Sequence, residues 1–208
     1  MIEEKSKNGV PLFVLTLAIG LGFQLIPTLL NLGVLWLVVG TVWNAALCAI
    51  AGYLLLGDRF TEQFKHFKWK VLAWGLPLTF AIGIGSGVIY HALFGAASQN
   101  SIADVITVQM IIIQVPLMLL GEELLSTNVL LALEEMGLPF KWASLICGVL
   151  FGLWHIPAYG PNILQLVITL MPVRLALNYI WKKSESVWVS WLCHFLYDCL
   201  GFIGFFAK

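Results

Sequence analysis

The sequence contains few charged residues, and this limits the class of protein to which it can belong. Only 11% of its 208 residues are Asp, Glu, Lys or Arg, whereas 60% are hydrophobic, and the mean hydropathy is +0.93. Ordinary globular chains carry roughly twice that share of charged residues. The formal net charge is zero, which excludes the strongly basic surface that nucleic-acid binding requires. We therefore predict a protein embedded in a lipid bilayer, without a nucleic-acid partner.

Several other signals are absent. The four cysteines lie in apolar runs without the paired spacing of zinc or redox sites, so we interpret them as small buried hydrophobes: Cys48, Cys147, Cys193 and Cys199. No short apolar segment ends in a small-residue cleavage site, which argues against a signal peptide. No internal repeat is visible. We expect residues 1–208 to form a single integral membrane domain.

The longest uncharged run indicates two membrane helices. No Asp, Glu, Lys, Arg or His occurs from Val10 to Leu56, and a spanning helix needs only about 20 residues. The turn between the two helices is predicted between Pro27 and Gly33. The next segment, 58–70, interleaves basic and aromatic residues, a pattern typical of an amphipathic surface helix but equally compatible with a plain loop.

Five further apolar segments complete an all-α, polytopic helical bundle with about seven transmembrane helices. The fourth span is predicted to begin at Ile102 and to continue towards a solvated end at Glu134-Glu135, before Gly137 and Pro139 interrupt the helix. The other four are predicted at residues 71–94, 142–154, 161–181 and 187–206.

The basic residues predict the orientation of this bundle. With seven spans and a cytoplasmic N-terminus, most of them fall on the cytoplasmic side: Lys5, Lys7, Arg59, Lys65, Lys68, Lys70, Lys141, Lys182 and Lys183. Only Lys208 falls outside, and Arg174 lies within a span. This asymmetry follows the positive-inside rule, so we predict an N-in, C-out protein. Its small size and short loops favour a multi-pass protein of a prokaryotic cell membrane.

Six polar side chains interrupt the later spans: Glu122, Glu123, Arg174, His155, His194 and Asp198. A charge at the centre of a membrane helix costs about 2.5–3.5 kcal/mol, so such residues mark functional sites unless the span ends beside them. Neighbouring Glu122 and Glu123 diverge by about 100° on a helix, so one can face a reaction centre while the other holds a neighbouring helix. His194 and Asp198 share a face, which allows the carboxylate to orient the imidazole. Arg174 can snorkel or pair with a carboxylate.

Three motifs in this region resemble those of the CAAX-protease and bacteriocin-processing (CPBP, or ABI) family of intramembrane peptidases. The family pattern is Glu-Glu-x-x-x-Arg, then Phe-x-x-x-His, then His-x-x-x-Asn or Asp. Here the three read Glu122-Glu123-Leu-Leu-Ser-Thr127, Phe151-Gly-Leu-Trp-His155 and His194-Phe-Leu-Tyr-Asp198. The resemblance covers about residues 119–200, within a peptidase-like core of about 102–206 that follows three additional spans at 10–95.

Thr127 occupies the position of the family's arginine. Arg174, on another helix, is one residue that could supply the glutamates with the positive charge of the missing arginine. Loss of the arginine is compatible with a divergent active subfamily, and also with an inactive protein that retains the fold.

The resemblance implies an endopeptidase that cleaves a membrane-associated substrate, such as a prenylated tail, a bacteriocin or a signalling-peptide leader. Glu122 is then the general base, with His155 sharing the water, and His194, oriented by Asp198, stabilises the oxyanion. Glu123 positions its helix or assists Glu122. A divalent metal such as zinc, held by Glu122, His155 and His194, is an alternative, although the chain lacks a His-Glu-x-x-His motif.

Two other functions fit the same residues. A non-catalytic scaffold or regulator would bind a membrane sensor protein through its spans. A small transporter would use the buried acids and histidines as a proton relay. One difficulty faces the peptidase hypothesis: Glu122 and His155 lie late in oppositely directed helices. We expect them to meet only if the fourth span is shifted later along the sequence, or if the helix ends differ from those predicted by a turn or two.

Overall fold

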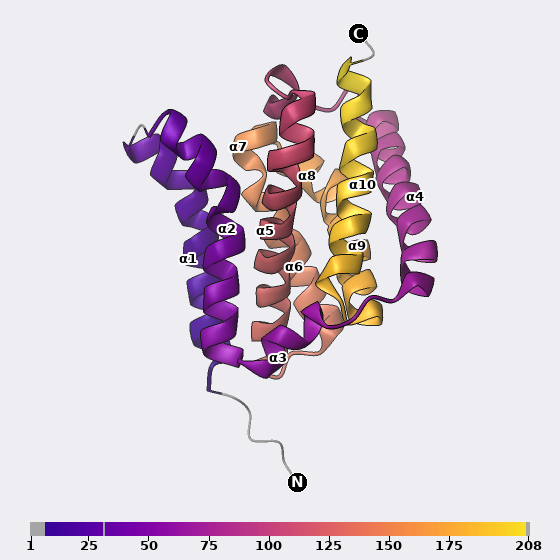
Figure 1. The fold of residues 1–208 in the computed structure, drawn as a ribbon. Coiled ribbons are helices and arrows are strands. Elements are labelled where there is room, and N and C mark those ends of the chain that lie inside the picture. The colour runs from indigo at the N-terminus through magenta and orange to yellow at the C-terminus, as the bar shows by residue number, and fades with distance from the viewer. Residues whose placement is uncertain (1–6, 31, 207–208) are drawn as a thin grey trace.

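Long helices aligned along one axis make up the computed structural model, which describes residues 7–206 apart from residue 31 (Figure 1). No strand occurs in this part of the chain, which confirms the all-α prediction. The elements are α1 (Gly9–Leu30), α2 (Val34–Leu56), α3 (Asp58–Thr61), η1 (Glu62–Phe64), α4 (Trp69–Phe94), η2 (Ser101–Asp104), α5 (Val108–Glu135), α6 (Phe140–Trp154), α7 (Ile156–Tyr159), α8 (Ile163–Thr169), α9 (Met171–Ser184) and α10 (Val187–Phe206).

Among the residues that the structure describes, five segments are long and apolar enough to cross a membrane: Gly9–Pro27, Val38–Leu56, Trp69–Phe94, Val108–Glu135 and Ile163–Ser184. The two remaining predicted spans are shorter apolar helices, Phe140–Trp154 and Val187–Phe202. The turn after α1 lies within the interval predicted for it, between Leu30 and Val34. The protein is therefore a multi-pass membrane protein, and the exact number of spans stays a prediction.

Two predicted spans have different limits in the structure. The fourth begins at Val108, where Thr107 caps the helix by accepting a hydrogen bond from the Met110 backbone, whereas Ile102 lies in η2. The sixth is broken at Leu170 into α8 and α9. Pro172 lies in the first turn of α9, where its missing N–H and fixed φ suit a helix start.

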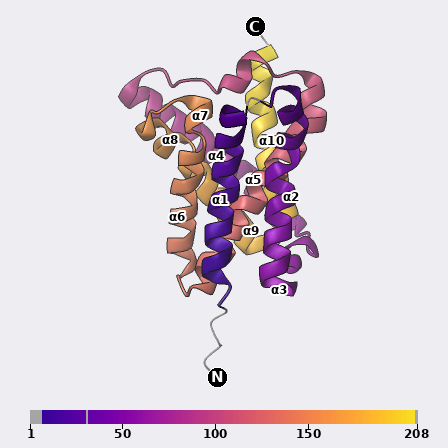
Figure 2. The same cartoon turned by 90° about the vertical axis from the view of Figure 1, so that its left-hand side faces the viewer.

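Helix α5 lies at the centre of the bundle. Helices α1, α2, α6 and α10 pack against it, and Figure 2 shows α1 and α2 in front of it. The Asn128 amide donates a hydrogen bond to the Cys48 carbonyl oxygen of α2 at 2.9 Å. Gly121 permits the close approach of the same two helices, because a Cβ there would lie 2.9 Å from the Ala45 backbone nitrogen. These contacts place the middle of α5 in the protein interior.

Helix α3 and the last turns of α5 and α9 lie at the same end of the bundle (Figure 1). Charged side chains of these three elements pair there. Lys182 pairs with Glu134 at 2.6 Å, and Arg59 pairs with Glu135. The solvated end predicted at Glu134-Glu135 is therefore wrong for Glu135, which is buried against Arg59. The 58–70 segment forms the short helical turns α3 and η1 rather than one long amphipathic helix.

The N-in orientation can be tested by cysteine labelling. Cys48, Cys147 and Cys193 are buried, and Cys199 is partly exposed. Replacing all four by Ser removes any labelling of native cysteines, so that only one newly introduced cysteine can react. We expect Lys65→Cys to react with a membrane-impermeant maleimide only after the cells are opened. Ala97→Cys, in the connection between α4 and α5, should react in intact cells. The reverse pattern would overturn the predicted orientation.

Candidate active site

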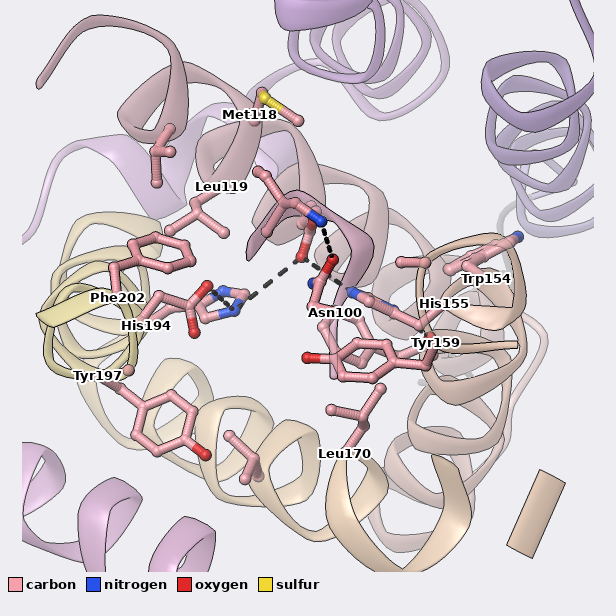
Figure 3. Close-up of a pocket in the computed structure, with 18 of the residues that line it drawn as sticks. Asn100, Met118, Leu119, Trp154, His155, Tyr159, Leu170, His194, Tyr197 and Phe202 are labelled. Carbon is pink, nitrogen blue, oxygen red and sulfur yellow. Dashed lines mark hydrogen bonds and ion pairs between the residues drawn. The ribbon is translucent and has the colours of Figure 1, made fainter. Parts of the chain in front are cut away.

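A partly open cavity of about 870 Å³ lies between the helices of the bundle and is lined by most of the predicted site residues. Glu122 enters it from the middle of α5, His155 from the junction of α6 and α7, and His194 and Asp198 from α10. His155 and His194 approach from opposite sides of this cavity (Figure 3). Because α5 begins at Val108, Glu122 lies halfway along it and meets the end of α6. Of the two conditions under which we expected Glu122 and His155 to meet, the structure shows the later start of the fourth span.

One carboxylate oxygen of Glu122 faces both imidazoles. Glu122 Oε2 lies 3.9 Å from His155 Nε2 and 4.0 Å from His194 Nε2. Both separations exceed the 2.7–3.2 Å of a direct hydrogen bond. The three groups therefore surround a common space without filling it.

The orientation of His155 is fixed by the end of its own helix. Its Nδ1 lies 2.7 Å from the Phe151 carbonyl oxygen, one turn earlier, and α6 ends at Trp154. The last carbonyls of a helix have no partner within it, so Phe151 is free to accept. A carbonyl oxygen only accepts, which places a proton on Nδ1 and turns Nε2 towards Glu122. The Phe-x-x-x-His spacing thus has a direct physical reason.

Glu123 lies outside the cavity, in a completely buried ion pair with Arg174 of α9. Arg174 Nη1 and Nη2 donate to Glu123 Oε1 and Oε2 at 2.6 and 3.0 Å, and both side chains are 0% exposed. Arg174 Nε donates to Asn178 Oδ1 at 2.9 Å. This two-pronged geometry is the strongest form of an arginine–carboxylate pair. Arg174 therefore supplies a positive charge to the glutamate motif from another helix.

The residue at the family's arginine position has a different partner. Thr127 is buried, and its hydroxyl donates to the Leu124 carbonyl oxygen of its own helix at 3.2 Å. The Arg174 guanidinium also lies 5.3 Å from the centre of the Phe151 ring, which packs against the His155 ring at 4.5 Å. Phe151 thus connects the ion pair to the cavity, a role that its place in the motif did not reveal.

His194 is oriented by the hydrogen bond that its ring donates to Glu123. His194 Nδ1 lies 3.0 Å from Glu123 Oε1, whereas Asp198 Oδ2 is 3.8 Å from Nε2. We expected Asp198 to supply this contact because it follows His194 by one helical turn. The two adjacent glutamates point in different directions, as expected for neighbours on a helix. Glu122 lines the cavity, and Glu123 is buried behind it.

The donors of Glu122, His155 and His194 suit a zinc ion chemically, but their spacing does not. Zinc bonds of about 2.0–2.1 Å place tetrahedral ligand atoms roughly 3.4 Å apart. Across residues 7–206 except 31, no three His, Cys, Asp or Glu side chains form a group that could hold a metal ion. The separations of these three groups therefore do not fit a zinc ion bound by all of them.

Other cavity residues were not singled out from the sequence. Gln24 and Asn44 reach the cavity from α1 and α2, and Asn100, Tyr159 and Tyr197 border it elsewhere (Figure 3 labels these last three). An amide within an uncharged membrane span was an available signal for Gln24 and Asn44. The loop and aromatic residues carried no such signal.

Comparison with protein families gives one match to this region. Residues 104–200 match the family model described as Type II CAAX prenyl endopeptidase Rce1-like. The matched segment is just under half of the chain and includes every predicted site residue as well as Arg174. It confirms the resemblance to the CAAX-type peptidases that the three motifs predicted. No curated protein matches the chain, and no solved structure does.

The Glu123–Arg174 pair predicts a large loss of stability when one partner is removed. Arg174→Met leaves a carboxylate buried without its counter-charge, which costs about 3–5 kcal/mol. The double variant Arg174→Met with Glu123→Met should regain most of this loss, because neither charge of the pair is then left buried without its partner. Thermal unfolding in detergent measures both, and Lys183→Met, at an exposed position of α9, is the control. Equal melting temperatures for Arg174→Met and Lys183→Met would contradict the role of the pair.

Proposed function

We propose that this protein is an intramembrane endopeptidase that cleaves a membrane-associated peptide or protein by means of a water activated by Glu122 and His155. One observation carries the proposal: a single Glu122 oxygen faces two imidazole nitrogens at 3.9 and 4.0 Å inside a cavity of an apolar helical bundle. The match of residues 104–200 to a family of CAAX-type endopeptidases supports the same class of reaction.

The gap between Glu122 and His155 suits one bridging water. Both facing atoms accept hydrogen bonds when Glu122 is ionised and His155 carries its proton on Nδ1. A water about 2.8 Å from each would donate one hydrogen to each, and its lone pair would be left free to attack a carbonyl carbon. Glu122 then accepts a proton from the water as the new C–O bond forms, and later delivers it to the leaving amide nitrogen.

His194 is placed to stabilise the negative charge that develops on the carbonyl oxygen. Glu123 accepts a hydrogen bond from the Nδ1–H of His194. When Nε2 also carries a proton, its N–H points into the cavity, where it can stabilise the oxyanion. The Glu123 carboxylate, 3.0 Å away, and Asp198, 3.8 Å from Nε2, balance the imidazolium charge. Arg174 in turn balances Glu123. This arrangement supplies the base and the electrostatic stabilisation that peptide hydrolysis needs.

The substrate class follows from the location of the site. The cavity is lined mainly by apolar side chains and lies within helices of membrane-spanning character. A prenylated tail, a bacteriocin precursor or a signalling-peptide leader each combines a peptide bond with a membrane-associated segment. We propose these three classes as substrates to be tested.

The alternative of a non-catalytic regulator that binds a membrane sensor protein rested on Thr127, which lacks the motif's charge. The bidentate contact from Arg174 weakens this alternative, because Glu123 has an arginine partner after all. We therefore favour the enzyme.

Replacement of Glu122 tests the proposal directly. In proteoliposomes, we expect the wild type to cleave at least one of three quenched fluorescent substrates: a farnesylated tail peptide, a bacteriocin leader or a signalling-peptide leader. Glu122→Gln preserves the shape of the side chain but removes the base, so the rate should fall about 10²–10⁴-fold. Glu134→Gln, which changes a glutamate at the end of α5, is the matched control and should retain activity.

A deletion strain gives the same test without a chosen substrate. Wild type should restore the pattern of secreted peptides measured by mass spectrometry, and Glu122→Gln at equal membrane levels should not. Equal restoration by both would overturn the peptidase proposal and favour the regulator.

Removal of metal ions distinguishes the two modes of water activation. Because the donors are too far apart for zinc, we expect kcat to remain unchanged after treatment with 1,10-phenanthroline and gel filtration. Metal analysis of the active protein should show less than stoichiometric zinc. Loss of activity that added zinc restores would contradict the metal-free mechanism while leaving the peptidase function in place.

A further inference from the structure

The α1–α2 hairpin forms part of the cavity although it lies outside the segment that matches the peptidase family. Gly20, Phe23 and Gln24 of α1 and Asn44 of α2 line the same cavity as Glu122. The family match begins only at residue 104. The hairpin therefore contributes to this site through residues that the family comparison leaves without a role.

Helix α1 contacts the residue next to His155. The Gln24 side-chain amide donates to the Trp154 carbonyl oxygen at 2.8 Å, across 130 positions of sequence. Trp154 is the last residue of α6, and His155 forms the turn into α7 with φ −92° and ψ 1°. The Trp154 carbonyl is one of the four that a helix leaves without a partner at its end. Gln24 thus stabilises the turn that carries His155.

Close packing reinforces this contact. A Cβ at Gly20 would lie 2.9 Å from two atoms of the Trp154 ring, so the backbone of α1 lies directly against that side chain. The Trp43 indole N–H of α2 donates to the Ile19 carbonyl oxygen at 3.0 Å and joins the two helices of the hairpin beside Gly20. Helix α1 is therefore held firmly at the level of Trp154.

Helix α2 contacts the residue next to Glu122. Gly121 lies against Asn44 and Ala45, where an added Cβ would be 2.9 Å from the Ala45 nitrogen. A continuous series of contacts thus runs from the neighbour of Glu122 through α2 and α1 to the neighbour of His155. The two groups proposed to share a water are each held by a neighbour that touches the hairpin.

We propose that Gln24 is a positioning residue, through which the α1–α2 hairpin holds His155 opposite Glu122 at the separation that one water bridges. This inference rests on the proposed function. Without the Gln24 amide, the Trp154 carbonyl loses its donor, and the turn at His155 keeps only the contacts within its own segment, from its ring to the Phe151 carbonyl and between backbone groups. Displacement of a reacting group by about 1 Å can cost roughly 10²-fold in rate.

Gln24→Met tests this role because methionine has a similar length and no donor. We expect kcat to fall about 10- to 100-fold with a change in KM of less than about three-fold, since the substrate still binds but the water is misplaced. Leu25→Ala, at the neighbouring position on the exposed face of α1, is the control and should retain the wild-type kcat. Unchanged kcat in Gln24→Met would overturn the inference.

A second measurement separates positioning from general destabilisation and does not need activity. Protein labelled with ¹⁵N-histidine contains four histidines, and a His155→Ala variant assigns the His155 ring signals by NMR. Gln24→Met should shift or broaden the His155 ring signals and leave those of His194 in place. A change at both histidines, or at neither, would contradict a specific effect on His155.

The two measurements together distinguish this inference from the proposed function. If the wild type cleaves substrate while Gln24→Met alters neither kcat nor the His155 signals, the inference fails and the peptidase stands. If no substrate is cleaved but the His155 signals shift, the peptidase proposal fails and the positioning contact stands.

Discussion

The buried pair of Glu123 and Arg174 is the interaction on which the site depends. Two charges with no exposed surface are costly to bury, and their geometry must be close to ideal to offset that cost. The pair meets this condition by two short contacts and connects α5 to α9. Glu123 also accepts from His194, which brings α10 to the same point. One carboxylate therefore fixes three helices and leaves Glu122 free to face the cavity.

Helix ends supply the second constraint. The His155 ring can contact the Phe151 carbonyl one turn earlier only because α6 ends at Trp154. The Trp154 carbonyl, at the end of the helix, accepts a hydrogen bond from Gln24 of α1. In an apolar interior an unpaired carbonyl is costly, so a helix that stops there needs donors from elsewhere. The imidazole and the amide both serve as such donors. The same contacts that satisfy the backbone also determine which nitrogen of His155 faces Glu122.

The spans and the convergence of the motifs could be predicted from the sequence, since both depend on local patterns. Apolar runs locate the helices, and spacings of four residues place Phe151 next to His155 and His194 next to Asp198. The sequence could offer Arg174 only as one possible partner of a carboxylate, and the contact between His194 and Glu123 was not predicted, because these two residues lie 51 and 71 positions from Glu123. The break at Leu170 and the late start of α5 depend on capping and tertiary packing rather than on hydropathy. Gln24 was missed because a single amide in a span carries no spacing that identifies its partner.

The missing motif arginine has a physical meaning once these contacts are known. What Glu123 requires is a fixed positive charge within hydrogen-bonding distance, and its position along the sequence is irrelevant to the electrostatics. An arginine at residue 127 would occupy the same helix as Glu123, whereas Arg174 comes from α9 and adds a connection between helices. The departure at Thr127 thus moves the source of the charge without removing it. A motif that lacks one residue is therefore weak support for loss of activity when the structure provides the same charge from another helix.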